Sequence, residues 1–207
     1  MIVVWILLGA LVAFALLNIA WRYVSRVWSV PCPSLIARSV DNPMLGRLTR
    51  TTLGRMELHP GQRIVEIGPG PGRLLIPAAQ RILPGGEAVG IDIQPGMIAR
   101  LKANVEKAGV TNLQPILGDA TQPHVPEASF DLVFLCTALG EIPDRPAVLA
   151  QAYRALKPGG VLSITEIAGD PHYQFRSKVQ RLAEAAGFRL QAMQGGWWFY
   201  TANFIKS

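Results

Sequence analysis

The sequence contains few charged residues and almost no cysteine. Only 16% of its 207 residues are Asp, Glu, Lys or Arg, against roughly 25% in an ordinary soluble domain. The two cysteines, Cys32 and Cys136, are too few for a disulfide scaffold or a four-cysteine zinc site, and we interpret both as free thiols. The three histidines are scattered, so no metal site is predicted. A hydrophobic content of 50% excludes a largely disordered chain.

The charges that are present are unevenly distributed. Residues 1–21 carry no charged side chain, and residues 22–58 carry six arginines against Asp41 and Glu57. Residues 59–207 have a net charge of only +2, so most of the overall net charge of +6 lies directly after the uncharged stretch. A nucleic-acid partner is disfavoured, because the larger part of the chain is nearly neutral and has no basic, aromatic-rich stripe.

A long apolar run begins near the start of the chain. Between Ile2 and Trp21 only Gly9 and Asn18 interrupt it, and as a helix it would be about 30 Å long, the thickness of a bilayer's hydrocarbon core. A cleaved signal peptide fits poorly, because no basic residue precedes the run and no small-x-small cleavage pattern follows it. We therefore expect a transmembrane anchor at residues 1–22.

The residues that flank this run predict its orientation. Trp5 near one end and Trp21 near the other are suited to the two membrane interfaces, where an aromatic ring is half buried and half hydrated. Arg22 and Arg26 follow directly. Because positive flanks stay in the cytoplasm, we expect a single-pass membrane protein with its N-terminus outside and its catalytic domain cytoplasmic.

Residues 23–58 form a basic connector that several prolines interrupt. Leu45, Leu48, Thr52 and Met56 recur at helical spacing, which predicts an amphipathic helix with arginines on another side. Two roles for this helix remain open. It either covers the first edge of the sheet that follows, or lies on anionic lipid and forms part of a substrate entrance.

Residues 59–207 alternate between short apolar strands and amphipathic helices. We expect strands at 63–67, 87–92, 113–117, 130–135 and 160–166, and helices at 72–83, 97–108, 147–156 and 177–186. Two more strands, 188–194 and 197–205, are joined by Gly195-Gly196, a hairpin signal. This order predicts a doubly wound α/β fold with a mostly parallel sheet and an antiparallel strand at its end.

A glycine-rich turn follows the first strand, and acidic residues follow the next two. The turn at 68–72, Gly-Pro-Gly-Pro-Gly, lets the backbone approach a ligand closely. A dinucleotide fingerprint is broken by Arg73 and Leu75, which disfavours a nicotinamide-dependent oxidoreductase. Asp92 ends its strand where a carboxylate can bind both hydroxyls of a ribose. Asp119 can accept from an adenine amine or stabilise its own loop.

In this order and spacing, the motifs resemble the class I S-adenosylmethionine-dependent methyltransferases, in particular the small-molecule branch that includes ubiquinone and menaquinone biosynthesis enzymes. The resemblance covers residues 58–205 and is carried by Val65–Gly72, Gly90–Asp92, Gly118–Ala120, Phe130–Val133 and Leu156–Gly160. It implies a Rossmann-like, seven-stranded sheet with an antiparallel last strand. It also implies S-adenosylmethionine as the cofactor, lying across the strand ends.

The resemblance also implies which residues bind this cofactor: Glu66, Gly68, Pro69, Gly70, Gly72, Asp92, Ile93, Asp119, Ala120, Cys136 and Thr137. By this analogy Glu66 and the glycine backbone hold the methionine part, and Asp92 holds the ribose. Asp119 and Ala120 frame the adenine, and Cys136 lies with Thr137 near the transferred methyl group.

No catalytic group is evident from the sequence. Transfer of an activated methyl group needs mainly a nucleophile placed in line, and a general base only if the acceptor must lose a proton. Candidates for that base are His172, Tyr173 and Glu141, which all lie in expected loops beyond strands. His172 and Tyr173 directly precede a helix, so helix entry and packing is the competing interpretation.

Three further side chains receive structural interpretations. Cys136 ends a buried strand, where cysteine is more often a small apolar filler than a nucleophile. Trp197 and Trp198 open the last expected strand, and we expect core packing there, with a substrate platform as the alternative.

The sequence therefore predicts a transmembrane anchor at 1–22, a basic amphipathic connector at 23–58 and a methyltransferase domain at 59–207. We expect transfer of a methyl group from S-adenosylmethionine to a small, lipophilic acceptor. The alternative is a catalytically silent, membrane-tethered protein that binds S-adenosylmethionine or serves in assembly.

Overall fold

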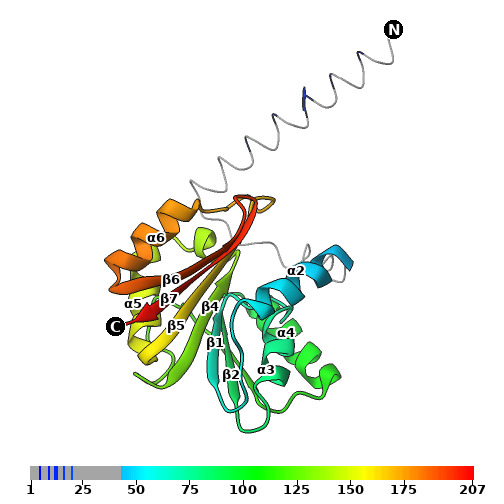
Figure 1. The fold of residues 1–207 in the computed structure, drawn as a ribbon. Coiled ribbons are helices and arrows are strands. Elements are labelled where there is room, and N and C mark those ends of the chain that lie inside the picture. The colour runs from blue at the N-terminus through cyan, green and yellow to red at the C-terminus, as the bar shows by residue number, and fades with distance from the viewer. Residues whose placement is uncertain (1–4, 6–8, 10–11, 14–15, 17–19, 21–42) are drawn as a thin grey trace.

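A computed structural model describes residues 43–207, together with the single positions 5, 9, 12, 13, 16 and 20 (Figure 1). Within this described part of the chain, no helix has both the length and the apolar character needed to cross a membrane. Apart from those single positions, the expected anchor at 1–22 and the connector as far as residue 42 lie outside the described residues.

A seven-stranded sheet forms the centre of the described part, in the order β3-β2-β1-β4-β5-β7-β6. Its strands are β1 (Arg63–Ile67), β2 (Glu87–Asp92), β3 (Leu113–Leu117), β4 (Phe130–Cys136), β5 (Leu156–Ile167), β6 (Phe188–Gly195) and β7 (Phe199–Lys206). Strands β1 to β5 are parallel, and β7 runs antiparallel to β5 and β6. The predicted sheet with its antiparallel last strand is confirmed.

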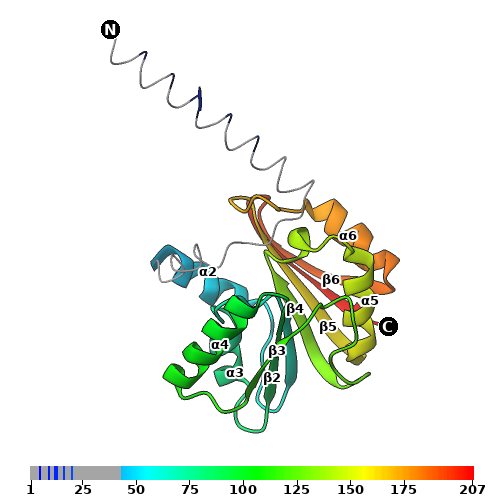
Figure 2. The ribbon, with the colours of Figure 1, turned by 180° about the vertical axis from the view of Figure 1, so that it is seen from behind.

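Helices cover both faces of the sheet (Figures 1 and 2). They are α2 (Pro43–Gly54), α3 (Leu75–Arg81), α4 (Pro95–Ala108), α5 (Arg145–Ala155) and α6 (Arg176–Ala185), with a 3₁₀ turn, η2, at Leu139–Glu141. Successive side chains of a strand point to opposite faces. Ile64 accordingly packs in one core cluster with residues of α2, α3 and α4, and Val65 in a second cluster with residues of α5 and α6.

The chain reverses its direction of winding between β1 and β4. From β1 it proceeds outward to β2 and β3, and then returns to pair β4 with the other side of β1. Parallel strands place their carboxyl ends at one edge of the sheet, and ligands of such folds bind there, at the point of reversal.

Several element boundaries differ from those expected, and two of them have a clear local reason. Helix α3 begins at Leu75 and not at 72, because Gly72 has a φ of 93°, which no helix accommodates. Strand β5 begins at Leu156 and not at 160, because Leu156 pairs with Phe130 ahead of an irregularity in the register. Strand β7 begins at Phe199 and not at 197.

The late start of β7 leaves two tryptophans outside the sheet. Trp197 is 75% exposed and Trp198 is 52% exposed. They lie in the turn between β6 and β7, and the expectation that they pack in the core is wrong.

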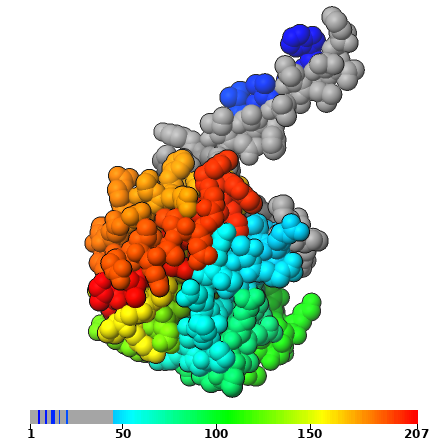
Figure 3. Space-filling model, in the orientation of Figure 1, coloured from blue at the N-terminus to red at the C-terminus, as the bar shows by residue number. Residues whose placement is uncertain are grey.

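Helix α2 has the predicted amphipathic character but does not cover an edge of the sheet, the first of the two roles left open. Thr52 and Met56 are buried, whereas Arg47 and Arg50 are exposed. The backbone carbonyl of Arg55, just after the helix, accepts a 2.7 Å hydrogen bond from Asn203 in β7. The edges of the sheet are β3 and β6, so α2 covers an inner region of one face and not an edge. Figure 3 shows it in cyan on the surface between the red hairpin and the green α4.

Candidate active site

A cavity of about 590 Å³ lies where β1, β2 and β4 end, at the point where the winding reverses. This volume is typical of a site for a small molecule or cofactor. The residues predicted from the sequence that line it are Glu66, Gly68, Pro69, Gly70, Asp92, Ile93, Asp119, Ala120, Cys136 and Thr137. Strand ends and the turns that follow them therefore bring these residues together, although they are widely separated in the sequence.

The glycine turn fits closely against the neighbouring loop. Gly68 has a φ of 71°, and a Cβ there would lie 2.8 Å from the Cβ of Ala138, so only glycine fits without a shift. Gly72, also predicted to bind cofactor, does not line the cavity. A Cβ at Gly72 would meet Leu101 in α4 at 2.6 Å, so this glycine permits close packing between the turn and α4.

Asp92 connects the glycine turn to the loop after β2. One carboxylate oxygen accepts from the backbone N–H of Gly70 at 3.2 Å, and the other accepts from the N–H of Gln94 at 2.9 Å. Burial raises the pKa of Asp92, and these two hydrogen bonds oppose the increase. Each carboxylate oxygen has a second lone pair, so Asp92 can accept further hydrogen bonds from a ligand.

Glu66 is the most deeply buried acid of the cavity wall. Its side chain is almost fully buried, and one carboxyl oxygen, Oε2, has no hydrogen-bond partner among the described residues. Burial raises the pKa of Glu66 to about 8, and Arg73 opposes this increase. An unpartnered, buried carboxyl oxygen in a cavity wall is suited to a donor or a cation supplied by a ligand.

The cavity wall is rich in acidic groups. Among the described residues it contains Glu66, Asp92, Asp119, Glu141 and Asp144, and Arg73 is the only basic residue among them. An excess of carboxyl groups in a confined site favours a ligand that carries positive charge.

Asp119 and Ile93 lie at the rim of the cavity. Asp119 accepts a 2.9 Å hydrogen bond from the backbone N–H of Thr121, and the bonds from Thr121 lower the pKa of Asp119. It therefore stabilises its own loop, the competing interpretation from the sequence, and also lines the cavity. The side chain of Ile93 is 57% exposed, as an apolar residue at a cavity mouth can be.

Sequence reasoning missed several residues of the cavity wall, among them Asp144 and Arg73, and it treated Arg73 only as an interruption of the dinucleotide fingerprint. Its guanidinium donates to Thr49 Oγ1 in α2 at 2.8 Å and to Cys136 Sγ at 3.4 Å. The available signal was a lone basic residue directly after the glycine turn.

Residues 136 and 137 form the part of the wall that follows β4. Cys136 is a free, buried cysteine, and burial raises its pKa to about 11, so it is a protonated thiol at neutral pH. Cys32 lies outside the described residues. Thr137 has a φ of 54°, which is unusual for a β-branched residue. Hydrogen bonds from its N–H to Thr165 O and from its Oγ1 to Cys136 O hold it there.

Of the three candidate bases, only Glu141 lines the cavity. His172 is buried behind it, with Nδ1 3.9 Å from Glu141 Oε1, a distance too long for a hydrogen bond. The Tyr173 hydroxyl donates to the backbone carbonyl of Trp197. Neither His172 nor Tyr173 lines the cavity. No cluster of side chains suited to a metal ion occurs in the part of the chain that the structure describes.

Residues 64–160 match the family described as methyltransferase domain. This region, just under half of the chain, is similar to methyltransferase domains. The sheet that it forms part of has the seven strands and the antiparallel strand that the resemblance to the class I, S-adenosylmethionine-dependent type implied.

Individual curated relatives are methyltransferases by name. A nocamycin O-methyltransferase from Saccharothrix syringae is 36% identical over 118 residues, which cover 57% of this chain and 42% of that protein. A demethylmenaquinone methyltransferase from Geobacillus kaustophilus is 31% identical over 122 residues, 59% of this chain and 52% of that protein. The chain thus spans about half the length of these curated relatives.

A solved structure shares the fold. The S-adenosylmethionine-dependent methyltransferase from Aquifex aeolicus superimposes with a TM-score of 0.79 at 18% identity. The match covers 85% of this chain and all of that one.

Proposed function

We propose that this protein transfers a methyl group from S-adenosylmethionine to a small, lipophilic acceptor at a membrane surface. The proposal rests on one observation: the acidic cavity at the winding reversal, where Glu66 has an unpartnered oxygen and Asp92 stands beside the glycine turn. The relatives named above act on small molecules, demethylmenaquinone among them.

The residues of the cavity fit S-adenosylmethionine, which when bound supplies an activated methyl group on a positively charged sulfur. Glu66 offers its unpartnered carboxyl oxygen to the ammonium group of the methionine part, and Arg73 is the basic group that the described wall offers to the carboxylate. Asp92 accepts from the ribose hydroxyls, and Asp119 with Ala120 borders the adenine. The Gly68 and Gly70 backbone allows the ligand to approach closely.

The remaining cavity wall positions the acceptor. Methyl transfer requires an acceptor atom held in line with the bond that breaks, and this placement supplies most of the rate enhancement. Cys136 and Thr137 border the region where the two substrates meet. Where the acceptor must lose a proton, Glu141 is the general base, because it alone of the three candidates reaches the cavity.

We further propose that residues 1–22 anchor the protein in the membrane as a single pass, with residues 23–58 as a basic connector. The uncharged run of residues 1–21, followed directly by Arg22 and Arg26, supports an anchor with the N-terminus outside and the methyltransferase domain, residues 59–207, in the cytoplasm. An anchor raises the local concentration of a lipid-soluble acceptor, which supports the lipophilic assignment.

The decisive experiment is a labelled-methyl transfer assay on a membrane lipid extract, with the product identified by mass spectrometry. We expect a labelled, lipid-soluble product from the full-length protein and much less of it from an Asp92→Ala variant at the same limiting cofactor concentration. Calorimetry on the same preparation measures cofactor binding. No binding by folded protein contradicts the proposal, whereas binding without turnover favours the catalytically silent alternative.

A second experiment tests the orientation. We expect protease to digest a C-terminal tag in sealed, inverted membrane vesicles, because the cytoplasmic side faces outward there. Protection of that tag would reverse the assignment.

A further inference from the structure

Exposed apolar side chains gather at one edge of the methyltransferase domain. Between residues 43 and 207, the large apolar side chains that are exposed in the described structure are Leu83, Ile93, Leu117, Phe175, Trp197 and Trp198. All except Leu83 lie on the side of the sheet where the parallel strands have their carboxyl ends. They follow or end a strand there, or lie in the β6–β7 turn. A monomeric domain seldom exposes several large aromatic side chains together without a function.

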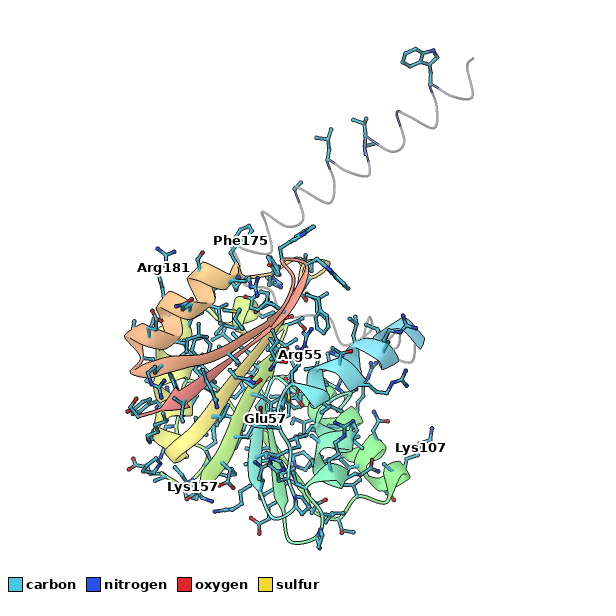
Figure 4. All side chains as sticks on the ribbon, viewed as in Figure 1. Arg55, Glu57, Lys107, Lys157, Phe175 and Arg181 are labelled. Atoms are coloured by element: carbon cyan, nitrogen blue, oxygen red, sulfur yellow. The ribbon has the colours of Figure 1, made fainter. Side chains whose placement is uncertain are left out.

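Three of these side chains, Phe175, Trp197 and Trp198, form what we call the aromatic tip. They are 62%, 75% and 52% exposed, respectively. Ile167 at the end of β5 is the register partner of Phe199 at the start of β7. The β6–β7 turn therefore lies at the same edge of the sheet as the cavity, and Figure 4 places Phe175 at this end of the molecule.

Hydrogen bonds hold the backbone of the aromatic tip in place. Ala168 donates to the carbonyl of Trp198 at 2.7 Å, and Gly196 donates to that of Phe199 at 3.1 Å. The Tyr173 hydroxyl donates to the carbonyl of Trp197. The backbone that carries the rings is therefore fixed before any binding. Little conformational entropy is lost when the rings bind to another surface.

Two guanidinium groups flank the tip. Arg176 donates to the carbonyl of Gly195 at 3.1 Å, and Arg55 lies against the same glycine. Neither arginine forms an ion pair within the described part of the chain. The interface of a membrane favours aromatic rings and carries anionic headgroups. Exposed tryptophans next to arginines that have no carboxylate partner in the described structure match both properties.

We propose that the aromatic tip inserts into the headgroup layer of an anionic bilayer and turns the mouth of the cavity toward the lipid. This inference rests on the membrane location proposed above. It assigns to the methyltransferase domain a second membrane contact, separate from residues 1–22, that gives a lipid-soluble acceptor a direct path into the cavity.

Tryptophan fluorescence of the full-length protein in vesicles tests this contact. The vesicles contain phosphatidylcholine and phosphatidylglycerol, with or without acyl chains brominated near the headgroup. The difference in emission between the natural protein and Trp197→Phe/Trp198→Phe isolates the signal of the tip. We expect brominated lipid to quench most of this difference signal, and acrylamide in the water to quench little of it.

A matched control places a tryptophan on the other side of the sheet, where the parallel strands begin. Leu83 is exposed between α3 and β2, so Leu83→Trp in the double-Phe background should be quenched by acrylamide and not by brominated lipid. Unchanged cofactor affinity shows that each variant is folded. If the double variant does not fold, the single Phe variants provide the same difference signal.

Two results would overturn the inference. Quenching of the tip by acrylamide alone places it in water, and no quenching by either agent means that protein covers it, either a second copy or another segment of this chain. Failure of the chain to float with the vesicles contradicts the membrane location itself. Methyl transfer is measured separately, so its absence leaves the quenching result intact.

Discussion

The backbone N–H of Gly70 donates to the carboxylate of Asp92 over 3.2 Å. The acid that we assign to the ribose therefore also fixes the glycine turn that we assign to the methionine part. Because the same carboxylate bonds Gln94 as well, one side chain organises two sides of the site.

Replacement of Asp92 by Ala should weaken cofactor binding by about 1.5 to 3 kcal/mol, as expected for the loss of hydrogen bonds to a charged group. Isothermal titration calorimetry measures the change in the dissociation constant. Asp119→Ala is the comparison: Asp119 also borders the cavity, but it is exposed and bonds mainly its own loop, so a smaller loss is expected. An equal loss in the two variants would contradict the special role of Asp92.

The affinity for S-adenosylmethionine should rise with pH until about pH 8. The pKa of Glu66 is raised to about 8, so at pH 7 most of the free protein carries a neutral Glu66. A cationic ligand favours the ionised form, so binding releases a proton, and the affinity increases by up to about tenfold per pH unit below that pKa.

Calorimetry in two buffers of different ionisation enthalpy counts the released proton. In Glu66→Gln this release should disappear, leaving only the titration of the ligand itself. Identical proton release by both proteins would show that Glu66 is not the coupled group.

Introduction of Ala at Gly68 should destabilise the domain more than the same change at Gly61. Both glycines have positive φ, 71° and 83°, but only at Gly68 does a new Cβ meet a neighbour, Ala138, at 2.8 Å. We expect about 1 kcal/mol for Gly61→Ala from backbone strain alone. The larger loss for Gly68→Ala should come with weaker cofactor binding.

Denaturant unfolding measures the loss of stability in each of the two variants, Gly61→Ala and Gly68→Ala. Adding Ala138→Gly to Gly68→Ala removes the opposing Cβ and should restore part of the cofactor affinity. If it restores none, the clash is not the cause.

The stability of the domain should fall as pH rises from about 5 to 8, and Glu166 should cause part of this decrease. Glu166 is buried at the end of β5, accepts a bond from Gln174 N at 3.1 Å, and has a pKa raised to about 8 by burial. Between the unfolded value of 4.5 and this pKa the native state holds a proton that the unfolded state has lost. The resulting loss amounts to roughly 3 kcal/mol between pH 4.5 and 7.

Glu166→Gln should flatten the dependence of the denaturation midpoint on pH and raise that midpoint at pH 8. Glu66 retains its own, similar contribution, so the double variant with Glu66→Gln should be flatter still. A midpoint for Glu166→Gln that falls as steeply as that of the natural protein would refute this assignment.

The arrangement of strands and helices could be predicted from the sequence because local patterns encode it. The apolar run at Arg63–Ile67 and the glycines after it mark a strand and a turn whatever the rest of the chain does. Cavity residues such as Asp92 were found in the same way, since strand ends at one edge of a parallel sheet must converge.

Other features depend on contacts that no local pattern contains. The role of Arg73 follows from Thr49 and Cys136, which are distant in sequence and meet only in the folded chain. Trp197 was misassigned because the run of apolar residues begins before the strand does, whereas β7 starts only at Phe199, the register partner of Ile167 in β5.

The hydrogen bond from Asn203 to the carbonyl of Arg55 spans 148 positions of sequence. During synthesis on a ribosome, the segment that follows α2 must therefore wait for β7 to emerge before it can be secured. Because β7 also lies between β5 and β6, the sheet and the cover over its face are completed together, after the other six strands have been made. Until then a nascent chain has an open apolar face, and it depends on rapid closure or on chaperones to avoid aggregation.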